Sequence, residues 1–215
     1  MKPLFDCIYS FDAQQCAQLG MRPLNQFFPL GFDEVRQGLG SPPAGGRAKK
    51  CFFLGRDKGR AAMLCALAQN LKANHCEADF HIVQDATTTL PSPYHVSQGM
   101  DYEQNLKRAQ QAEVLVEINQ PGQVGATLRA LEAAYFGKKL ITNNPAVKEL
   151  ELYHPANVFV LESQGASNVN QLESFLKCPL QALPEGVLYR YSPDFMLEQL
   201  MADAEAQRSA ERSAR

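Results

Sequence analysis

The first residues that could do chemistry form a basic turn at residues 55–60, with the sequence Gly-Arg-Asp-Lys-Gly-Arg. An apolar run at 50–54 precedes it and predicts a buried strand. The two glycines allow a close approach to the backbone, and the helix expected next offers free amides to an anion. Arg56 can bind a phosphate through two parallel hydrogen bonds, whereas Lys58 supplies a point charge. The turn predicts either a phosphate site or a solvated turn whose basic residues balance Asp57.

A second turn crosses residues 119–127 and leads into a helix expected from Gly125 to about Phe136. Glu132 lies seven residues after Gly125, which places its carboxylate roughly 10 Å along the helix from the amide end. This spacing fits a diphosphate at the helix N-terminus with its ribose hydroxyls beside Glu132. Alternatively, Glu132 forms a surface ion pair with Arg129 at i, i+3.

The two turns are expected at the same edge of one sheet, because the carboxyl ends of parallel strands share an edge. One turn is basic, and the other offers helix amides and a carboxylate. On the helix itself, Leu128, Leu131 and Tyr135 are expected to form the core face, with Glu132 off that face. Together the turns predict a site for a nucleoside diphosphate.

Alternating apolar runs and helical patterns predict the fold that positions these turns. We expect an α/β protein with a Rossmann-like, doubly wound parallel sheet. Strands are expected near 7–11, 50–54, 78–84, 114–118, 139–142 and 157–161, and helices near 12–19, 59–73, 101–111, 125–136 and from about 193.

The chain is expected to divide into four parts. Residues 1–36 are interpreted as a remnant of a preceding domain or an edge extension, and the Gly- and Pro-rich segment 37–48 as a linker. Residues 49–205 are expected to form the nucleotide-sugar-binding domain. Residues 206–215 are small and charged and are expected to form a flexible tail.

Composition narrows the function classes. A net charge of -2 in 215 residues gives no electrostatic case for nucleic acid as a partner. The six cysteines are scattered and the four histidines lack ligand spacing, so neither disulfides nor a zinc site is expected. We find no signal peptide and no apolar run long enough for a membrane helix. The expected location is the cytoplasm, with peripheral attachment to an inner membrane as an alternative.

Four segments carry a resemblance to a known family: 9–12, 53–60, 120–133 and 137–144. They resemble a bacterial family of lipopolysaccharide-core and capsule glycosyltransferases with the GT-B fold. The third segment is the most specific, and the resemblance extends from about Cys7 to Tyr191. It implies that the chain corresponds to the C-terminal, donor-binding half of such an enzyme.

Carried over by residue, the resemblance implies that Arg56 and Lys58 hold the donor diphosphate and that Glu132 holds the ribose. The sequence departs from the family in two ways. Val124 takes the place of the family's first glutamate, and the resemblance leads us to expect that the acceptor-binding half, which precedes the position of Tyr9 in the family, is absent. The complete set of residues expected to bind the donor is Gly55, Arg56, Lys58, Gly59, Arg60, Gln123, Gly125, Ala126, Thr127, Arg129 and Glu132, with no metal, no further cofactor and no assigned catalytic residue.

The resulting hypothesis is transfer of a sugar from a nucleoside-diphosphate donor to a glycan or lipid-linked acceptor at the cell surface. Three alternatives stay open: a non-catalytic nucleotide-sugar-binding subunit, a related enzyme such as a nucleotide-sugar epimerase, and a Rossmann-like interaction domain without a ligand. The subunit alternative expects a partner chain or a second copy of this chain to bind through residues 1–36.

Overall fold

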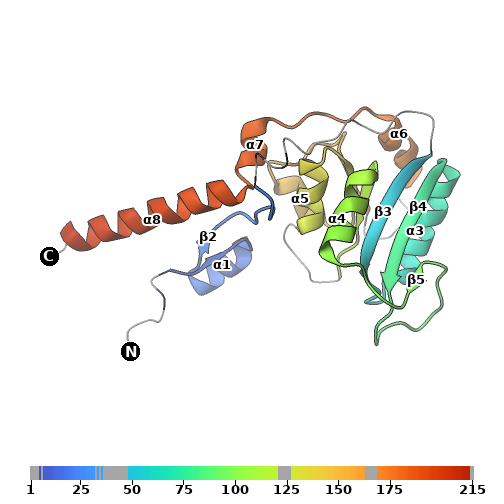
Figure 1. Ribbon diagram of the computed structural model, residues 1–215, viewed down its shortest axis with the longest axis horizontal. Helices are drawn as coiled ribbons and strands as arrows, with labels where there is room; N and C mark the ends of the chain where they lie inside the picture. Colours follow the sequence, from blue (N-terminus) through green and yellow to red (C-terminus); the bar gives the residue numbers. More distant parts are fainter. Residues whose placement is uncertain are drawn as a thin grey trace.

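The computed structural model describes residues 5, 7–31, 33, 35, 48–120, 127–162 and 169–213. Its main body is a six-stranded sheet in the order β5-β4-β3-β6-β7-β8, and every neighbouring pair is parallel (Figure 1). This arrangement confirms the expected α/β class with a Rossmann-like parallel sheet. The strands are β3 (Lys49–Arg56), β4 (Cys76–Val83), β5 (His95–Val96), β6 (Val114–Glu117), β7 (Lys139–Thr142) and β8 (Val158–Val160).

The strand order contains one reversal of direction. From β3 the chain builds outward through β4 and β5, and it then returns to the other side of β3 for β6, β7 and β8. The switch point therefore lies between β3 and β6. The connecting helices are α3 (Ala61–Ala73), α4 (Tyr102–Gln111), α5 (Leu128–Tyr135), α6 (Leu172–Lys177) and α7 (Glu185–Tyr189), with the 3-10 segments η1 (Pro145–Glu149) and η2 (Val169–Gln171).

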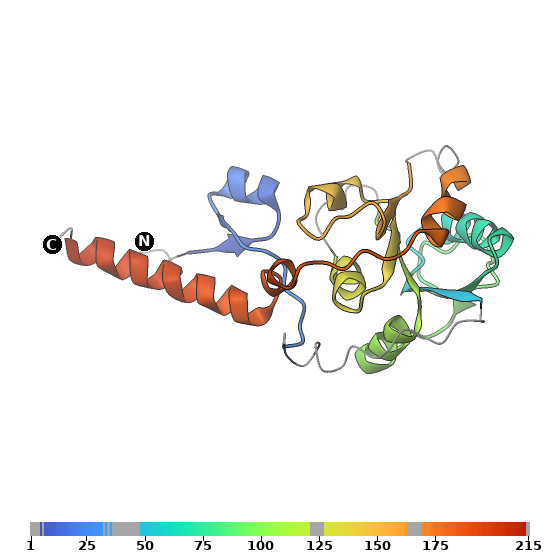
Figure 2. The same ribbon diagram turned by 90° about the horizontal axis from the view of Figure 1, so that it is seen from above.

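Helices cover both faces of the sheet (Figure 2). Alternation along β3 sends Phe53 into an apolar layer with α3 and α6, and Phe52 into a second layer with α4 and α5. Both phenylalanines are buried. Because both faces are covered, the central strands are continuous apolar runs, which is why the sequence predicted them correctly.

A small second unit lies beside the main body. Strands β1 (Tyr9–Ser10) and β2 (Arg22–Pro23) pair in parallel and are joined by α1 (Ala13–Leu19). The long helix α8 (Pro193–Ser213) extends from the main body alongside them (Figure 1). Asp203 on α8 accepts a hydrogen bond from the Tyr9 hydroxyl at 2.9 Å and pairs with Arg22 at 3.0 Å. These contacts attach the end of the chain to its beginning.

Several features differ from the sequence-based expectations. The pairing of β5 with β4, the short helices α6 and α7, and the pairing of β1 with β2 have no counterpart among the predicted elements. The expected flexible tail 206–215 is helical as far as Ser213, because its Ala, Glu, Gln and Arg residues favour helix. Of the expected linker, 37–47 lie outside the described residues. None of the helices in the described part of the chain combines the length and apolar character needed to cross a bilayer.

Candidate ligand site at the sheet switch point

The candidate site lies at the carboxyl edge of the sheet, where β3 and β6 end side by side. In open α/β sheets this switch point is the general position for ligands. Hydrogen bonds connect the segments that follow β3, β6 and β7 at this edge. The Arg60 guanidinium, from the turn after β3, donates from Nη1 to the Ile118 carbonyl after β6. Asn143, after β7, accepts from the Asn119 amide at 2.7 Å and donates to the Asn119 carbonyl at 3.1 Å.

The basic turn after β3 contains two kinds of cation. The side chains of Arg56 and Lys58 are exposed at the edge. Arg60 is instead half-buried over the Phe53 ring, 5.5 Å from its centroid, and donates to the carbonyls of Arg56 and Asp57 as well as to the Ile118 carbonyl. Burial lowers the Arg60 pKa. Arg56 and Lys58 are therefore the side chains that can meet an incoming anion, while Arg60 shapes the turn.

Glycine is required at the two positions of the turn for different physical reasons. Gly59 has φ +74°, in the left-handed region that favours glycine, and Lys58 before it has φ +50°. At Gly55 a side-chain Cβ would lie 3.1 Å from Arg60 Nη2 and 3.2 Å from the Phe53 ring. Gly55 thus makes room for the Arg60 guanidinium on that ring.

Asp57 links the turn to the next part of the edge. Its carboxylate is only 2% exposed and accepts from the Ala61 amide at 3.1 Å, the Thr88 hydroxyl at 2.9 Å and His95 Nε2 at 3.0 Å. Burial acts to raise the Asp57 pKa, but these hydrogen bonds outweigh it and the pKa is lowered. Asp57 is therefore buried and connects the end of β3 to α3 and β5 by hydrogen bonds. The solvated-turn alternative expected it to balance the charge of the basic residues in water.

Glu117, the last residue of β6, is a buried carboxylate that the sequence reasoning did not single out. It is 5% exposed and accepts hydrogen bonds from the hydroxyls of Thr127 and Thr142, the latter at 2.5 Å. Burial raises its pKa, against the lowering effect of both hydroxyls. A lone acidic residue inside an otherwise apolar strand was the available signal for it. Glu117 connects the carboxyl ends of β6 and β7 to the first turn of α5.

Glu132 and Arg129 form the ion pair that the sequence spacing allowed, but the pair is buried. Arg129 Nη1 lies 2.5 Å from Glu132, whose side chain is 2% exposed, and Arg129 Nη2 donates to Asn105 Oδ1 at 2.8 Å. The guanidinium covers the Phe52 ring at 5.1 Å. Burial raises the Glu132 pKa and lowers the Arg129 pKa, in each case against the attraction of the partner.

The expected core face of α5 was therefore wrong in two places. Leu128 is 37% exposed, and Glu132 points into the layer between α4 and α5. The reason is tertiary: Asn105 on α4 and Phe52 on β3 provide partners for a charged pair, which the periodicity of α5 alone does not reveal.

The loop expected to deliver helix amides is only partly described. Gln123, Gly125 and Ala126 lie outside the described residues. Thr127 caps α5 by accepting from the Arg129 amide at 3.2 Å, and its hydroxyl donates to Glu117. The N-terminus of α5 thus begins at the carboxyl edge of β6, on the same side of the switch point as Glu117.

Arg56 lies on the same face of the sheet as the Arg129–Glu132 pair. Arg56 lies four residues beyond Phe52 on β3, so alternation places it on the face that Arg129 and Glu132 cover. Arg56 and Glu132 are therefore not separated by the sheet. Among the described residues, no group of three or more His, Cys, Asp or Glu side chains could hold a metal ion.

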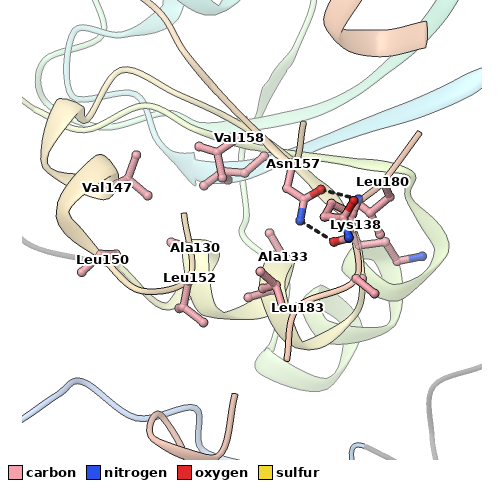
Figure 3. A pocket seen from close by; sticks show the side chains of 15 residues that line it. Ala130, Ala133, Lys138, Val147, Leu150, Leu152, Asn157, Val158, Leu180 and Leu183 are labelled. Carbon is pink, nitrogen blue, oxygen red and sulfur yellow. Dashed lines mark hydrogen bonds between the residues drawn. The ribbon is translucent and has the colours of Figure 1, made fainter. Parts of the chain in front are cut away.

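A separate apolar cavity of about 60 Å³ lies along α5, away from this edge (Figure 3). It is lined by the first residues of β7 and β8, among them Leu140 and Val158, and by residues 180–183. Asn157 fastens that segment by accepting from the Gln181 amide and donating to its carbonyl, both at 2.8 Å. At this volume the cavity is too small to enclose a nucleotide.

The fold is shared with solved glycosyltransferase structures, among them the following two. AviGT4, described as a glycosyltransferase involved in avilamycin A biosynthesis, matches with a TM-score of 0.56 and 14% identity over 91% of this chain and 62% of its own. A glycosyltransferase from Rickettsia africae ESF-5 matches with a TM-score of 0.56 and 13% identity over 88% of this chain and 59% of its own. No family model matches the sequence. No curated protein is significantly similar to it in sequence. The chain spans about three fifths of these two glycosyltransferases and has their fold over that length.

Proposed function

We propose that this chain is the donor-binding half of a glycosyltransferase that uses a nucleoside-diphosphate sugar. The observation that carries the proposal is the position of Arg56 and Lys58. Arg56 ends β3 beside the switch point, and Lys58 follows it on the turn, where the Lys58 amide donates to Asp85 after β4. Both side chains are exposed, in a fold shared with two glycosyltransferases. Both the N-terminus of α5 and these cations favour a negatively charged ligand at this edge.

The chemistry that this site would supply is stabilisation of a leaving group. During sugar transfer an acceptor hydroxyl oxygen forms a bond to the anomeric carbon and loses its proton. The bond between that carbon and the diphosphate oxygen breaks, and its electrons stay on the diphosphate. Arg56 and Lys58 would offset the negative charge that develops there. Arg60, Asp57 and Glu117 would act indirectly by fixing the turns that present these cations and the start of α5.

The finer assignments rest on the resemblance. Membership of a lipopolysaccharide-core or capsule pathway would make the acceptor a cell-surface glycan or its lipid-linked precursor. The ribose contact implied for Glu132 stays a prediction. Because Arg129 already holds that carboxylate at 2.5 Å, a ribose hydroxyl would have to share it with the guanidinium.

The first test removes one exposed cation. Arg56→Ala is expected to weaken binding of a nucleoside diphosphate by about 1.5–3 kcal/mol, the scale of a charge-assisted hydrogen bond, and to change nucleoside binding far less. Isothermal titration calorimetry with ADP, GDP and UDP and their nucleosides measures both. Lys72→Ala, at the opposite end of α3, is the charge-matched control and should bind like the unaltered chain. Equal losses for diphosphate and nucleoside would reject the assignment of Arg56.

A second candidate function is a non-catalytic donor-binding subunit that works with a partner chain. Exposed apolar side chains on the β1–α1–β2 unit and on α8 favour it. More than half of the residue surface is exposed in Phe5 and Ile8 just before β1, in Phe11 and Leu19 of the unit, and in Leu197 and Met201 of α8. Exposed apolar surface of this kind marks interaction sites when it is contiguous. Sugar transfer by a strictly monomeric preparation would exclude this candidate, and binding without transfer would support it.

A further inference from the structure

Asn119 carries an unpaired hydrogen-bond donor at the centre of the candidate site. The residue follows β6 and is 7% exposed, and its side-chain nitrogen Nδ2 is buried without a hydrogen-bond partner. In the part of the chain that the structure describes, Gln26 Oε1 is the one other buried side-chain atom in this condition. Buried polar atoms are nearly always paired in native proteins, so an unpaired donor at a ligand-binding edge points to a missing partner.

The backbone around Asn119 is fixed from both sides. Arg60 holds the preceding carbonyl, at Ile118, and Asn143 holds the amide and the carbonyl of Asn119 itself at 2.7 and 3.1 Å. The clamps come from the turns after β3 and β7, the two strands that flank β6. A residue held this firmly cannot shift its backbone to pair its side chain elsewhere. The unpaired donor is therefore a built feature of the switch point.

We propose that the Asn119 side-chain amide donates a hydrogen bond to an oxygen of the bound nucleoside diphosphate. This inference rests on the proposed function and adds a specific binding residue to that site. An amide nitrogen only donates, so its partner must be an acceptor. The exposed cations Arg56 and Lys58 at the same edge select an anion, and diphosphate oxygens are strong acceptors.

If Asn119 acts in this way, replacing it should change the stability of the free protein and its affinity for the ligand in opposite directions. In the free protein the unpaired donor costs stability, because its hydration was lost without a replacement. A side chain of similar size without the donor should therefore make the free protein more stable while it weakens ligand binding. If the asparagine were purely structural, the same substitution would lower the stability of the free protein and leave the affinity unchanged.

The test uses the full chain with Asn119→Leu. Calorimetric titration with the tightest binding of ADP, GDP and UDP should show affinity lowered about tenfold or more, and the Tm of the free protein should rise. Gln26→Met is the matched control, since it removes the other unpaired buried atom, which lies in the N-terminal segment. It should leave the affinity unchanged.

Each outcome decides between the two claims. If the unaltered chain binds no nucleoside diphosphate, the proposed function fails and the role of Asn119 fails with it. If the unaltered chain binds and Asn119→Leu binds equally well, only the role of Asn119 is overturned. Should the leucine variant not fold, Asn119→Ala replaces it, with the same loss of affinity expected and unchanged affinity again overturning the proposal.

Discussion

Arg129 and Glu132 show how far a charged pair depends on its surroundings. Both side chains are largely buried, with 12% and 2% exposed, and Asn105 completes a triangle of polar contacts over Phe52. Taking both charges out of water is costly, and their mutual attraction repays that cost only while both partners are present. The pair therefore fixes the packing of α4 against α5 more than it adds net stability.

Removing one partner should be much worse than removing both. Arg129→Met leaves Glu132 buried without its cation and is expected to cost about 3–5 kcal/mol of unfolding free energy, measured by urea denaturation. The double variant Arg129→Met, Glu132→Leu should recover most of that loss. In the exposed pair Lys177–Glu173, Lys177→Met is the control and should change the unfolding free energy far less, because water screens both charges. Equal costs for the buried and exposed pairs would show that the Arg129 charge is not buried in solution.

At this scale the sequence predicted which residues pair but not where they lie. The i, i+3 spacing of Arg129 and Glu132 follows from the helix alone. The burial of the pair depends on Asn105 and Phe52, which come from other elements, and the engagement of Arg60 with Ile118 depends on β6 lying next to β3. Only contacts between distant segments decide whether a basic side chain is free for a ligand.

Among the elements, the extended segment 24–31 joins the small unit to the main body. Phe28 is fully buried, stacks on Tyr135 of α5 with centroids 4.7 Å apart, and meets Phe136 edge-on at 5.5 Å. Its amide donates to the Tyr191 carbonyl at 2.8 Å, just before α8. One aromatic residue thus locks the N-terminal segment, α5 and the start of α8 together.

Phe28→Ala should therefore act as a core substitution although the residue lies in an irregular segment. We expect a loss of about 3–5 kcal/mol in unfolding free energy, the usual cost of deleting a buried phenylalanine. Phe27→Ala is the neighbouring control, because Phe27 is 37% exposed and should cost much less. Denaturant unfolding followed by circular dichroism gives both values. A near-zero effect of Phe28→Ala would mean that the segment does not dock on α5 in solution.

Elements with local signals could be predicted, and elements without them could not. Asp101 accepts from the Gln104 amide at 2.8 Å at the start of α4, and Gly137 ends α5 with φ +58°, as the capping residues indicated. The two-residue strand β5 has no pattern of its own and exists because the segment around His95 pairs with β4. Short elements defined by their neighbours carry too little local information for prediction.

The whole molecule has two parts of unequal size, and each part has a different proposed role. The main body holds the switch-point site, while the β1–β2 pair and α8 extend from it (Figures 1 and 2). These extending elements carry exposed apolar side chains. Two paired strands are only marginally stable without further packing. We therefore propose that a partner chain or a second copy covers this unit. The alternating pattern predicted a parallel sheet, but the strand order, which places the switch point, requires non-local contacts.

The central claim is that a nucleoside diphosphate binds at the carboxyl edge between β3 and β6. Hydrogen–deuterium exchange of the full chain, with and without a saturating nucleoside diphosphate, tests its location directly. The account predicts slower exchange at 55–61, 118–120 and 127–130, with residues 74–77 and 172–177 at the opposite edge unchanged. Protection confined to that opposite edge, or to residues 180–183 beside the apolar cavity, would contradict it.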